Sequence, residues 1–279
     1  MKEAMNMLHY EFMRIAFLVA ILLGIAIPLV GSTTIYKRLS ASGDALAHSS
    51  LAGVAIGLAA GINPLLISII ACVVSFLLIE LIRKRFSKFN ELAVSIVLSA
   101  SIAVAGIVSK YASGGNLESY LFGSILMVDD IELYLVIGIT AISIIFYLFF
   151  YRQIFAYLYN EDEAKVQGIK VGWINFFQSL LVSLVIAISA KTIGSLVVSS
   201  LIAIPLATSL QAKLSYKKTL ILSIIVSLIS MIGGIIISYY LEWRAGASIA
   251  LVSIALLIFF LLFRLIYDAI KKKRNSKSI

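Results

Sequence analysis

Long uncharged apolar runs constrain this chain more than any other feature. Of its 279 residues, 61% are hydrophobic and 13% are charged, about half the usual share of charged residues for a soluble domain. A helix that crosses a hydrocarbon core needs about 20 mainly apolar residues. The runs therefore predict an all-α, polytopic integral membrane protein. No polar stretch is long enough to fold as a separate soluble domain, so residues 1–279 are expected to form one membrane domain.

Nine such runs are expected to span the membrane, with a short outer segment at about residues 1–11 and a basic tail at about 264–279. The turn Asn63-Pro64 separates the second and third runs, because proline cannot continue a helix. The second and seventh runs are short, and a re-entrant path for either would reduce the count to eight. The expected spans lie at 15–35, 44–61, 65–82, 92–109, 133–151, 173–190, 194–210, 220–241 and 246–263.

The distribution of the 23 Lys and Arg residues predicts the orientation. One set of alternate loops holds most of them, including the clusters at 83–88, 213–218 and 264–277. The other set holds only Lys2, Arg14, Lys110, Lys191 and Arg244. The C-terminus is therefore expected in the cytoplasm and the N-terminus outside. The net charge of +9 reflects this bias, and no basic stripe interleaved with aromatics points to nucleic acid. The single Cys72 cannot form an intramolecular disulfide.

Asp44 and His48 are the main candidates for a metal contact. They lie one helical turn apart, so they share a helix face, and ionisable groups at membrane depth tend to be functional. A carboxylate and an imidazole suit a borderline divalent cation such as zinc or manganese. Two ligands form an incomplete coordination shell, and a homodimer with a two-fold axis through the pathway would supply four. The alternative is that Asp44 caps the helix N-terminus and His48 is an interfacial residue.

Gly53, Gly57 and Gly61 form a stripe on the opposite side of the same expected helix. Glycines at this spacing allow a neighbouring helix to approach closely in lipid. The stripe is therefore expected to pack against a partner helix while Asp44 and His48 point into a polar pathway. These five residues make 43–61 the segment around which the expected pathway is organised.

Three further stretches are candidates for function. On the expected cytoplasmic side, the acidic residues Glu161, Asp162 and Glu163 favour the N-terminus of a short helix, and Gly168 suits its C-terminal end. This helix is either a docking element for a cytoplasmic partner or an ordinary loop helix. On the outer side, 111–130 contains Tyr120-Leu121-Phe122-Gly123, which is either a half-buried re-entrant loop or a gate. Glu242, beside Trp243, is either an interface anchor or an acid where the metal enters.

These stretches together resemble the permease subunits of bacterial and archaeal ABC importers for zinc, manganese and iron. The resemblance covers about residues 12–263. It is carried by GDALAH at 43–48, YLFG at 120–123, Glu163-Ala164 with Gly168, GSLVVSSLIAIPLA at 194–207, and Ala245-Gly246-Ala247. Two departures are Glu242, where relatives more often have Asp, and Ser99-Ala100-Ser101, which lacks a histidine found in some zinc permeases. Because of the second departure, zinc is a less secure assignment of the substrate, and manganese or iron remains an alternative.

The resemblance implies the type II importer architecture in a prokaryotic plasma membrane. It implies a homodimer, two cytoplasmic ATPase subunits that dock around Glu161 to Gly168, including Ala164, and an extracellular metal-binding protein. It places Asp44 and His48 as contacts for the ion in transit, with no permanently bound cofactor. The chain has no GxxxxGK[ST] motif, so ATP hydrolysis is expected on a separate chain.

Three other classes of protein fit the sequence less well. A secondary transporter of metals or organic cations would work without an ATPase, but it needs intramembrane charges that the span centres largely lack. An intramembrane aspartyl protease would have to pair Asp44 with Asp268, which lies beyond the last expected span. A purely structural membrane protein would not explain the matching stretches.

Overall fold

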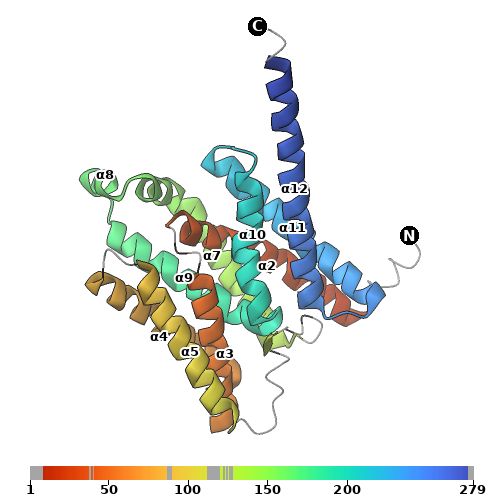
Figure 1. Cartoon of the computed structure of the whole chain (residues 1–279). Helices are drawn as coiled ribbons and strands as arrows, with labels where there is room; N and C mark the ends of the chain where they lie inside the picture. The colour runs from red at the N-terminus through yellow and green to blue at the C-terminus, as the bar shows by residue number, and fades with distance from the viewer. Residues whose placement is uncertain are drawn as a thin grey trace.

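The computed structural model describes residues 9–37, 39, 41–86, 90–111, 120–121, 123, 125 and 128–275. Within these residues all the regular elements are helices (Figure 1). Their bounds are α2 Glu11–Tyr36, α3 Ser42–Ala60, α4 Pro64–Arg85, α5 Asn90–Ser109, α7 Asp130–Tyr159, α8 Glu161–Val166, α9 Val171–Thr192, α10 Ser195–Leu210, α11 Tyr216–Leu241 and α12 Ala245–Asn275.

Seven of these helices are long and apolar enough to cross a membrane: α2, α4, α5, α7, α9, α11 and α12. The other two long helices are α3, whose polar side chains lower its hydropathy, and α10, which has only 16 residues. They correspond to the second and seventh expected runs, which are the weakest in the sequence. The all-α membrane fold predicted from the sequence is confirmed.

One expected boundary is wrong, and one helix continues beyond its expected span. The fifth expected span ends at residue 151, but the residues from Arg152 to Tyr159 continue α7, because no glycine or proline interrupts them and Ile154 and Tyr157 are buried. The basic tail from Arg264 continues α12 as far as Asn275. At about 1.5 Å per residue, α7 and α12 are each longer than the hydrocarbon core of about 30 Å.

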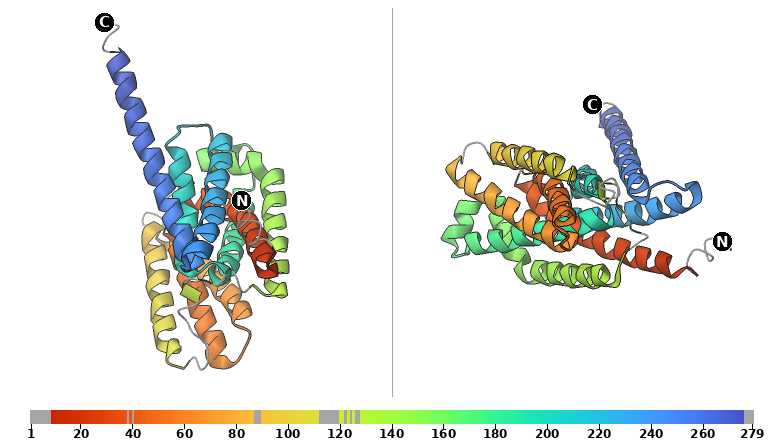
Figure 2. Two further views of the ribbon diagram at one scale, coloured as in Figure 1. Left: turned by 90° about the vertical axis from the view of Figure 1, so that its right-hand side faces the viewer. Right: turned by 90° about the horizontal axis from the view of Figure 1, so that it is seen from below.

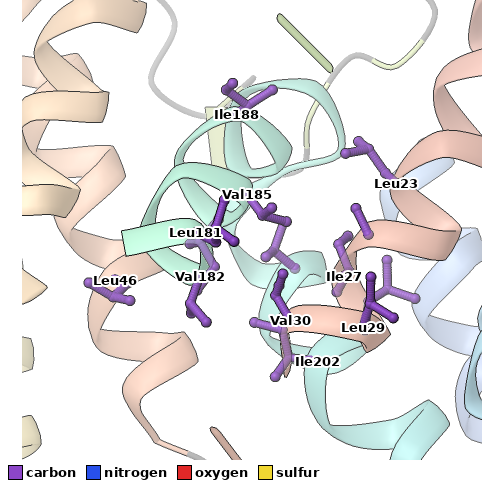
Figure 3. Packing of buried hydrophobic residues seen from close by; sticks show 14 of the residues in the cluster. Leu23, Ile27, Leu29, Val30, Leu46, Leu181, Val182, Val185, Ile188 and Ile202 are labelled. Carbon is purple, nitrogen blue, oxygen red and sulfur yellow. The ribbon is translucent and has the colours of Figure 1, made fainter. Parts of the chain in front are cut away.

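The interior of the bundle is built from helices that pack closely at small residues. α2 packs against α7, α9, α10 and α11. A β-carbon added to Gly24 of α2 would lie 2.9 Å from Leu228 of α11, and one added to Gly31 would lie 3.0 Å from Ile202 of α10. Figure 3 shows Ile202 beside Val30, with side chains from α9 filling the space towards Leu46 of α3.

Figure 2 shows that α12 leaves the bundle at one end, while α3, α4 and α5 form a group at the other side of the molecule. α3 packs against α4, α5, α9 and α10, so most of its residues are buried. The helix that carries the candidate site is therefore an internal element with neighbours on several sides.

Candidate functional site

Asp44 lies in the first turn of α3 and does not cap it. The N-cap is Ala41, whose side chain makes no capping hydrogen bond, and the helix begins at Ser42. The cap interpretation of Asp44 is therefore wrong, although its carboxylate still lies where the positive end of the helix dipole favours an anion. The side chain of Asp44 is exposed and that of His48 is partly exposed, whereas Ala45, Leu46 and Ala47 between them are buried.

The pair is an incomplete ligand set within one copy of the chain. Among the residues that the structure describes, no three His, Cys, Asp or Glu side chains come close enough together to hold a metal ion. The carboxylate of Asp44 and the imidazole of His48 thus offer an oxygen donor and a nitrogen donor on the same face of α3. Asp44 is exposed at the surface of the chain and His48 is partly exposed. Such a set can bind an ion tightly only when other donors, from solvent or from another chain, complete it.

The glycine stripe packs α3 against α4 at two of its three positions. A β-carbon added to Gly53 would lie 2.6 Å from Cα of Ser68, and one added to Gly57 would lie 2.7 Å from Cα of Pro64. Gly61 does not belong to this contact: a β-carbon there would meet nothing within 4 Å. It is instead the C-cap of α3 with φ of +66°, where glycine avoids the strain of a left-handed conformation.

A serine pair joins α3 to α5 next to His48. The hydroxyl oxygens of Ser49 and Ser101 lie 2.7 Å apart, and both side chains are buried. Ser49 also donates to the carbonyl oxygen of Ala45 at 2.7 Å, so the hydroxyl of Ser101 donates to Ser49. The Ser99-Ala100-Ser101 segment, noted in the sequence for its missing histidine, therefore contacts the helix that carries the candidate site.

The segment around Gly123 is held against the turn between α9 and α10. Tyr120 is partly buried, and Gly123 has φ of +72°. A β-carbon added to Gly123 would lie 2.0 Å from the carbonyl carbon of Ile193 and 2.4 Å from the amide nitrogen of Gly194. The two backbones are thus in direct contact, which only glycine permits. Phe122 lies outside the described residues.

A buried ion pair lies near the same turn and was not assigned from the sequence. Lys191, in the last turn of α9, pairs with Glu132, in the first turn of α7. The side chain of Glu132 is only 5% exposed. An acid directly before an expected span and a lysine at the end of another are the sequence signals that could have suggested this pair.

α8 is a short helix with defined ends. The side chain of Asn160 accepts hydrogen bonds from the amides of Asp162 and Glu163, at 3.1 and 3.3 Å. Gly168, at φ of +79°, follows the C-cap residue Gln167, as expected from the sequence. Ala164 is buried and anchors the helix, whereas Asp162 and Glu163 are exposed, as is Val166, at 89%. Glu161 pairs with Lys165 at 2.9 Å and raises the pKa of that lysine.

A charged cluster lies beneath α8, where α2, α4, α7 and α9 come together. A cavity of about 370 Å³ is lined there by Lys37, Arg83, Glu161, Lys165 and Asn175, among others. Lys37 donates to Oδ1 of Asn175 and lies 4.8 Å from the ring centroid of Tyr157. Burial lowers the pKa of Lys37 to about 8, although the Glu80 carboxylate opposes this effect.

The same lysine lines a second cavity, which reaches the beginning of α3. A smaller cavity of about 30 Å³ is lined by Lys37, Glu80 and Arg83 together with Ser42 and Leu46 of α3. Arg83 donates to Glu80 at 2.7 Å on α4. A lysine two residues after the first expected span has the appearance of an ordinary interfacial charge, so no pattern in the sequence predicts this cluster.

Glu242 lies in a different part of the molecule from α3. It is the exposed C-cap of α11, with φ of +54°, in the turn before α12. The hydroxyl of Ser238 donates to the carbonyl oxygen of Trp243 at 2.6 Å, which fixes this turn. α11 and α12 pack against each other and against α10. Glu242 is therefore a surface acid that is separate from the Asp44 and His48 pair in sequence and in helix packing.

Comparison with known proteins gives consistent matches along nearly the whole chain. The sequence model of the ABC 3 transport family matches residues 9–264. A probable metal transport system membrane protein of Treponema pallidum is 37% identical over 255 residues, covering 90% of this chain and 95% of that protein. A manganese transport system membrane protein of Listeria monocytogenes is 29% identical, with 92% of each chain covered.

A high-affinity zinc uptake system membrane protein of Buchnera aphidicola is 32% identical over 250 residues, covering 88% of this chain and 94% of the relative. Among solved structures, PsaBC from Streptococcus pneumoniae in complex with Fab superposes with a TM-score of 0.82 at 25% sequence identity. The match covers 93% of this chain and 94% of that one.

Proposed function

Because the chain belongs to the ABC 3 transport family and is a transmembrane permease of the ABC importer type, we propose that it carries a divalent transition-metal ion into the cytoplasm. Relatives named for manganese and for zinc transport support a metal cargo. Manganese, zinc and iron are the candidate ions, since carboxylate and imidazole donors suit all three. The ion is the transported substrate, which passes through the permease.

The observation that carries this proposal is the placement of Asp44 and His48. They form an exposed face on a helix that is otherwise mostly buried, and the described residues supply no third acidic, histidine or cysteine donor beside them. Two copies of the chain around a two-fold axis would bring four donors together at one level of a shared pathway. A weak set of this kind releases the ion readily, as transport requires.

The energy source is proposed to be a separate ATPase, two copies of which dock on α8 and its neighbouring loop from the cytoplasm. An extracellular metal-binding protein would deliver the ion to the outer face, near Tyr120–Gly123 and Glu242. This arrangement takes the C-terminus as cytoplasmic and the N-terminus as external, in agreement with the distribution of Lys and Arg along the sequence.

Uptake of radioactive manganese, zinc and iron into vesicles that contain the permease, its ATPase and its binding protein tests the proposal. We expect ATP-dependent uptake of one ion that the other two inhibit to different extents. Asp44→Asn and His48→Gln should each lower uptake at least about tenfold, since even the loss of an outer-shell partner of a metal ligand has an effect of this size. Asp129→Asn and His9→Gln, which change exposed residues of the same types, are the controls.

Equal uptake by the site variants and the wild type would contradict the assignment of Asp44 and His48. Uptake that persists without ATP and follows an ion gradient would instead support the secondary transporter.

A further inference from the structure

A second cavity lies at the end of the molecule where α12 leaves the bundle. Its volume is about 490 Å³, and it lies between the loop joining α10 to α11 and the distal part of α12. Figure 1 shows this loop at the same end of the molecule as the projecting part of α12. The cavity has no lining residue in common with the candidate metal path or with the charged cluster beneath α8.

The cavity contains an excess of positive charge. Lys213, Arg264 and Lys271 line it, together with a single carboxylate, that of Asp268. Arg264 is held in place from two sides: it donates to Oε1 of Gln211 at 2.9 Å, and it lies 3.6 Å from the carboxylate of Asp268 on the next turn. An arginine fixed in this way presents its remaining donors in a defined direction, which suits a phosphate group.

The other wall of the cavity is aromatic. Phe260 and Phe263 line it: Phe260 lies one turn before Arg264, and Phe263, which is 63% exposed, directly precedes Arg264. The apolar part of α12 that can span a membrane ends at Ile266. Arg264 lies within this span, close to its end, and Lys271 follows it. A bilayer whose hydrocarbon region ends near Ile266 would surround the phenyl rings with acyl chains, and the long side chain of Arg264 would reach the headgroups beside Lys271.

We propose that this cavity binds the headgroup of an anionic phospholipid in the leaflet that surrounds this end of α12. The phosphate would contact Lys213, Arg264 and Lys271, and the upper part of an acyl chain would lie against Phe260 and Phe263. Basic cavities between membrane helices are a recurring setting for such headgroups. The aromatic wall at membrane depth favours a lipid over free phosphate, which would gain nothing from it.

The bound lipid would add a further link between the loop joining α10 to α11 and the distal part of α12, beside the hydrogen bond from Arg264 to Gln211. It would thereby fix the angle at which α12 projects from the bundle. This site does not depend on the identity of the transported ion. In the orientation proposed above, the leaflet is the cytoplasmic one.

Native mass spectrometry of the purified full-length protein, titrated with phosphatidylglycerol and separately with phosphatidylcholine, tests this site. We expect at least one phosphatidylglycerol to bind in preference to phosphatidylcholine. Lys213→Gln/Arg264→Gln should weaken that binding about thirtyfold, the equivalent of about 1 kcal/mol for each basic residue. Lys217→Gln/Lys218→Gln removes the same charge from exposed positions outside the cavity and should leave the binding unchanged.

A second variant, Phe260→Ala/Phe263→Ala, separates a lipid from a free anion. It should weaken phosphatidylglycerol binding with all charges still present, and glycerol 3-phosphate at millimolar concentration should not displace the lipid from the wild type. Equal losses in the cavity and control variants would overturn the proposal in favour of diffuse charge attraction. Displacement of the lipid by glycerol 3-phosphate would overturn the proposal in favour of a simple anion site. If the protein is a stable dimer that does not prefer phosphatidylglycerol to phosphatidylcholine, the proposal is also overturned, because a second copy then covers this face.

Discussion

The backbone of Gly123 lies directly against that of Ile193, so closely that a β-carbon at position 123 would be 2.0 Å from the carbonyl carbon of Ile193. This contact joins the segment around Gly123 to the turn between α9 and α10, although Gly123 and Ile193 are 70 positions apart in the sequence. Gly123 also has φ of +72°, a conformation that other residues adopt only with strain. Two independent constraints therefore require glycine here.

Gly123→Ala is expected to move the segment around Gly123 away from the turn at 193–194 and to lower the thermal unfolding midpoint in detergent. The loss in stability should exceed about 1 kcal/mol, since strain at a left-handed position and a backbone clash both contribute. Gly138→Ala is the matched control, because a β-carbon on Gly138 would meet nothing within 4 Å. An equal midpoint for both variants would show that the loop is not tightly held.

The stability of the folded protein is expected to fall much more when one partner of the ion pair between Glu132 and Lys191 is removed than when both are removed. Lys191→Met leaves the buried carboxylate of Glu132 without its cation, which typically costs about 3–5 kcal/mol. Glu132→Gln/Lys191→Met removes both charges and should recover most of that loss. Unfolding midpoints of the two single variants and the double variant measure the coupling; additive losses would contradict a direct interaction.

The sequence predicts the secondary structure well wherever local chemistry decides it. The acidic run from Glu161 to Glu163 and Gly168 mark the ends of α8, and the spacing of Gly53 and Gly57 indicates the face on which α3 packs. Each of these signals involves residues within two helical turns. The expected boundary fails at α7, and α12 continues as a helix beyond its expected span, because charged residues at the membrane surface resemble a loop even when the helix continues.

The candidate site is only partly visible in the sequence. Asp44 and His48 stand out because ionisable residues are rare in apolar runs, but their capping alternative could be rejected only once Ala41 was located at the N-cap. The hydrogen bond between Ser49 and Ser101, the pair of Glu132 and Lys191, and the cluster around Lys37 all join distant segments. No local pattern specifies which segments will meet.

Charge reversal on the exposed face of α8 is expected to disrupt docking of the ATPase. Asp162→Lys/Glu163→Lys changes two exposed side chains and leaves the buried anchor Ala164 in place. The variant permease should retain its unfolding midpoint but lose co-purification with the ATPase. Lys217→Glu/Lys218→Glu, which reverses two exposed charges at the beginning of α11, is the control. Normal co-purification of the α8 variant would contradict the assignment of α8 as the docking element.

Lys37 is expected to make stability depend on pH in the alkaline range. Its pKa is lowered from 10.5 to about 8 in the folded protein because burial disfavours the charged amine, with the Glu80 and Glu161 carboxylates opposing that effect and Arg83 adding to it. The unfolded chain therefore binds a proton more tightly than the folded protein. Stability contributed by the neutral lysine is fully present above about pH 10.5 and is lost as the pH falls to about 8.

Lys37→Gln removes this titration. The difference in unfolding free energy between the wild type and the variant should change in favour of the wild type between pH 8 and 10.5, by at most about 3 kcal/mol. Subtracting the variant cancels the titration of the tyrosines. Lys84→Gln, which removes a neighbouring charge on α4 without altering the cavity lining, should follow the wild type. A constant difference between the wild type and Lys37→Gln would show that Lys37 remains charged throughout, with its partners fully compensating for burial.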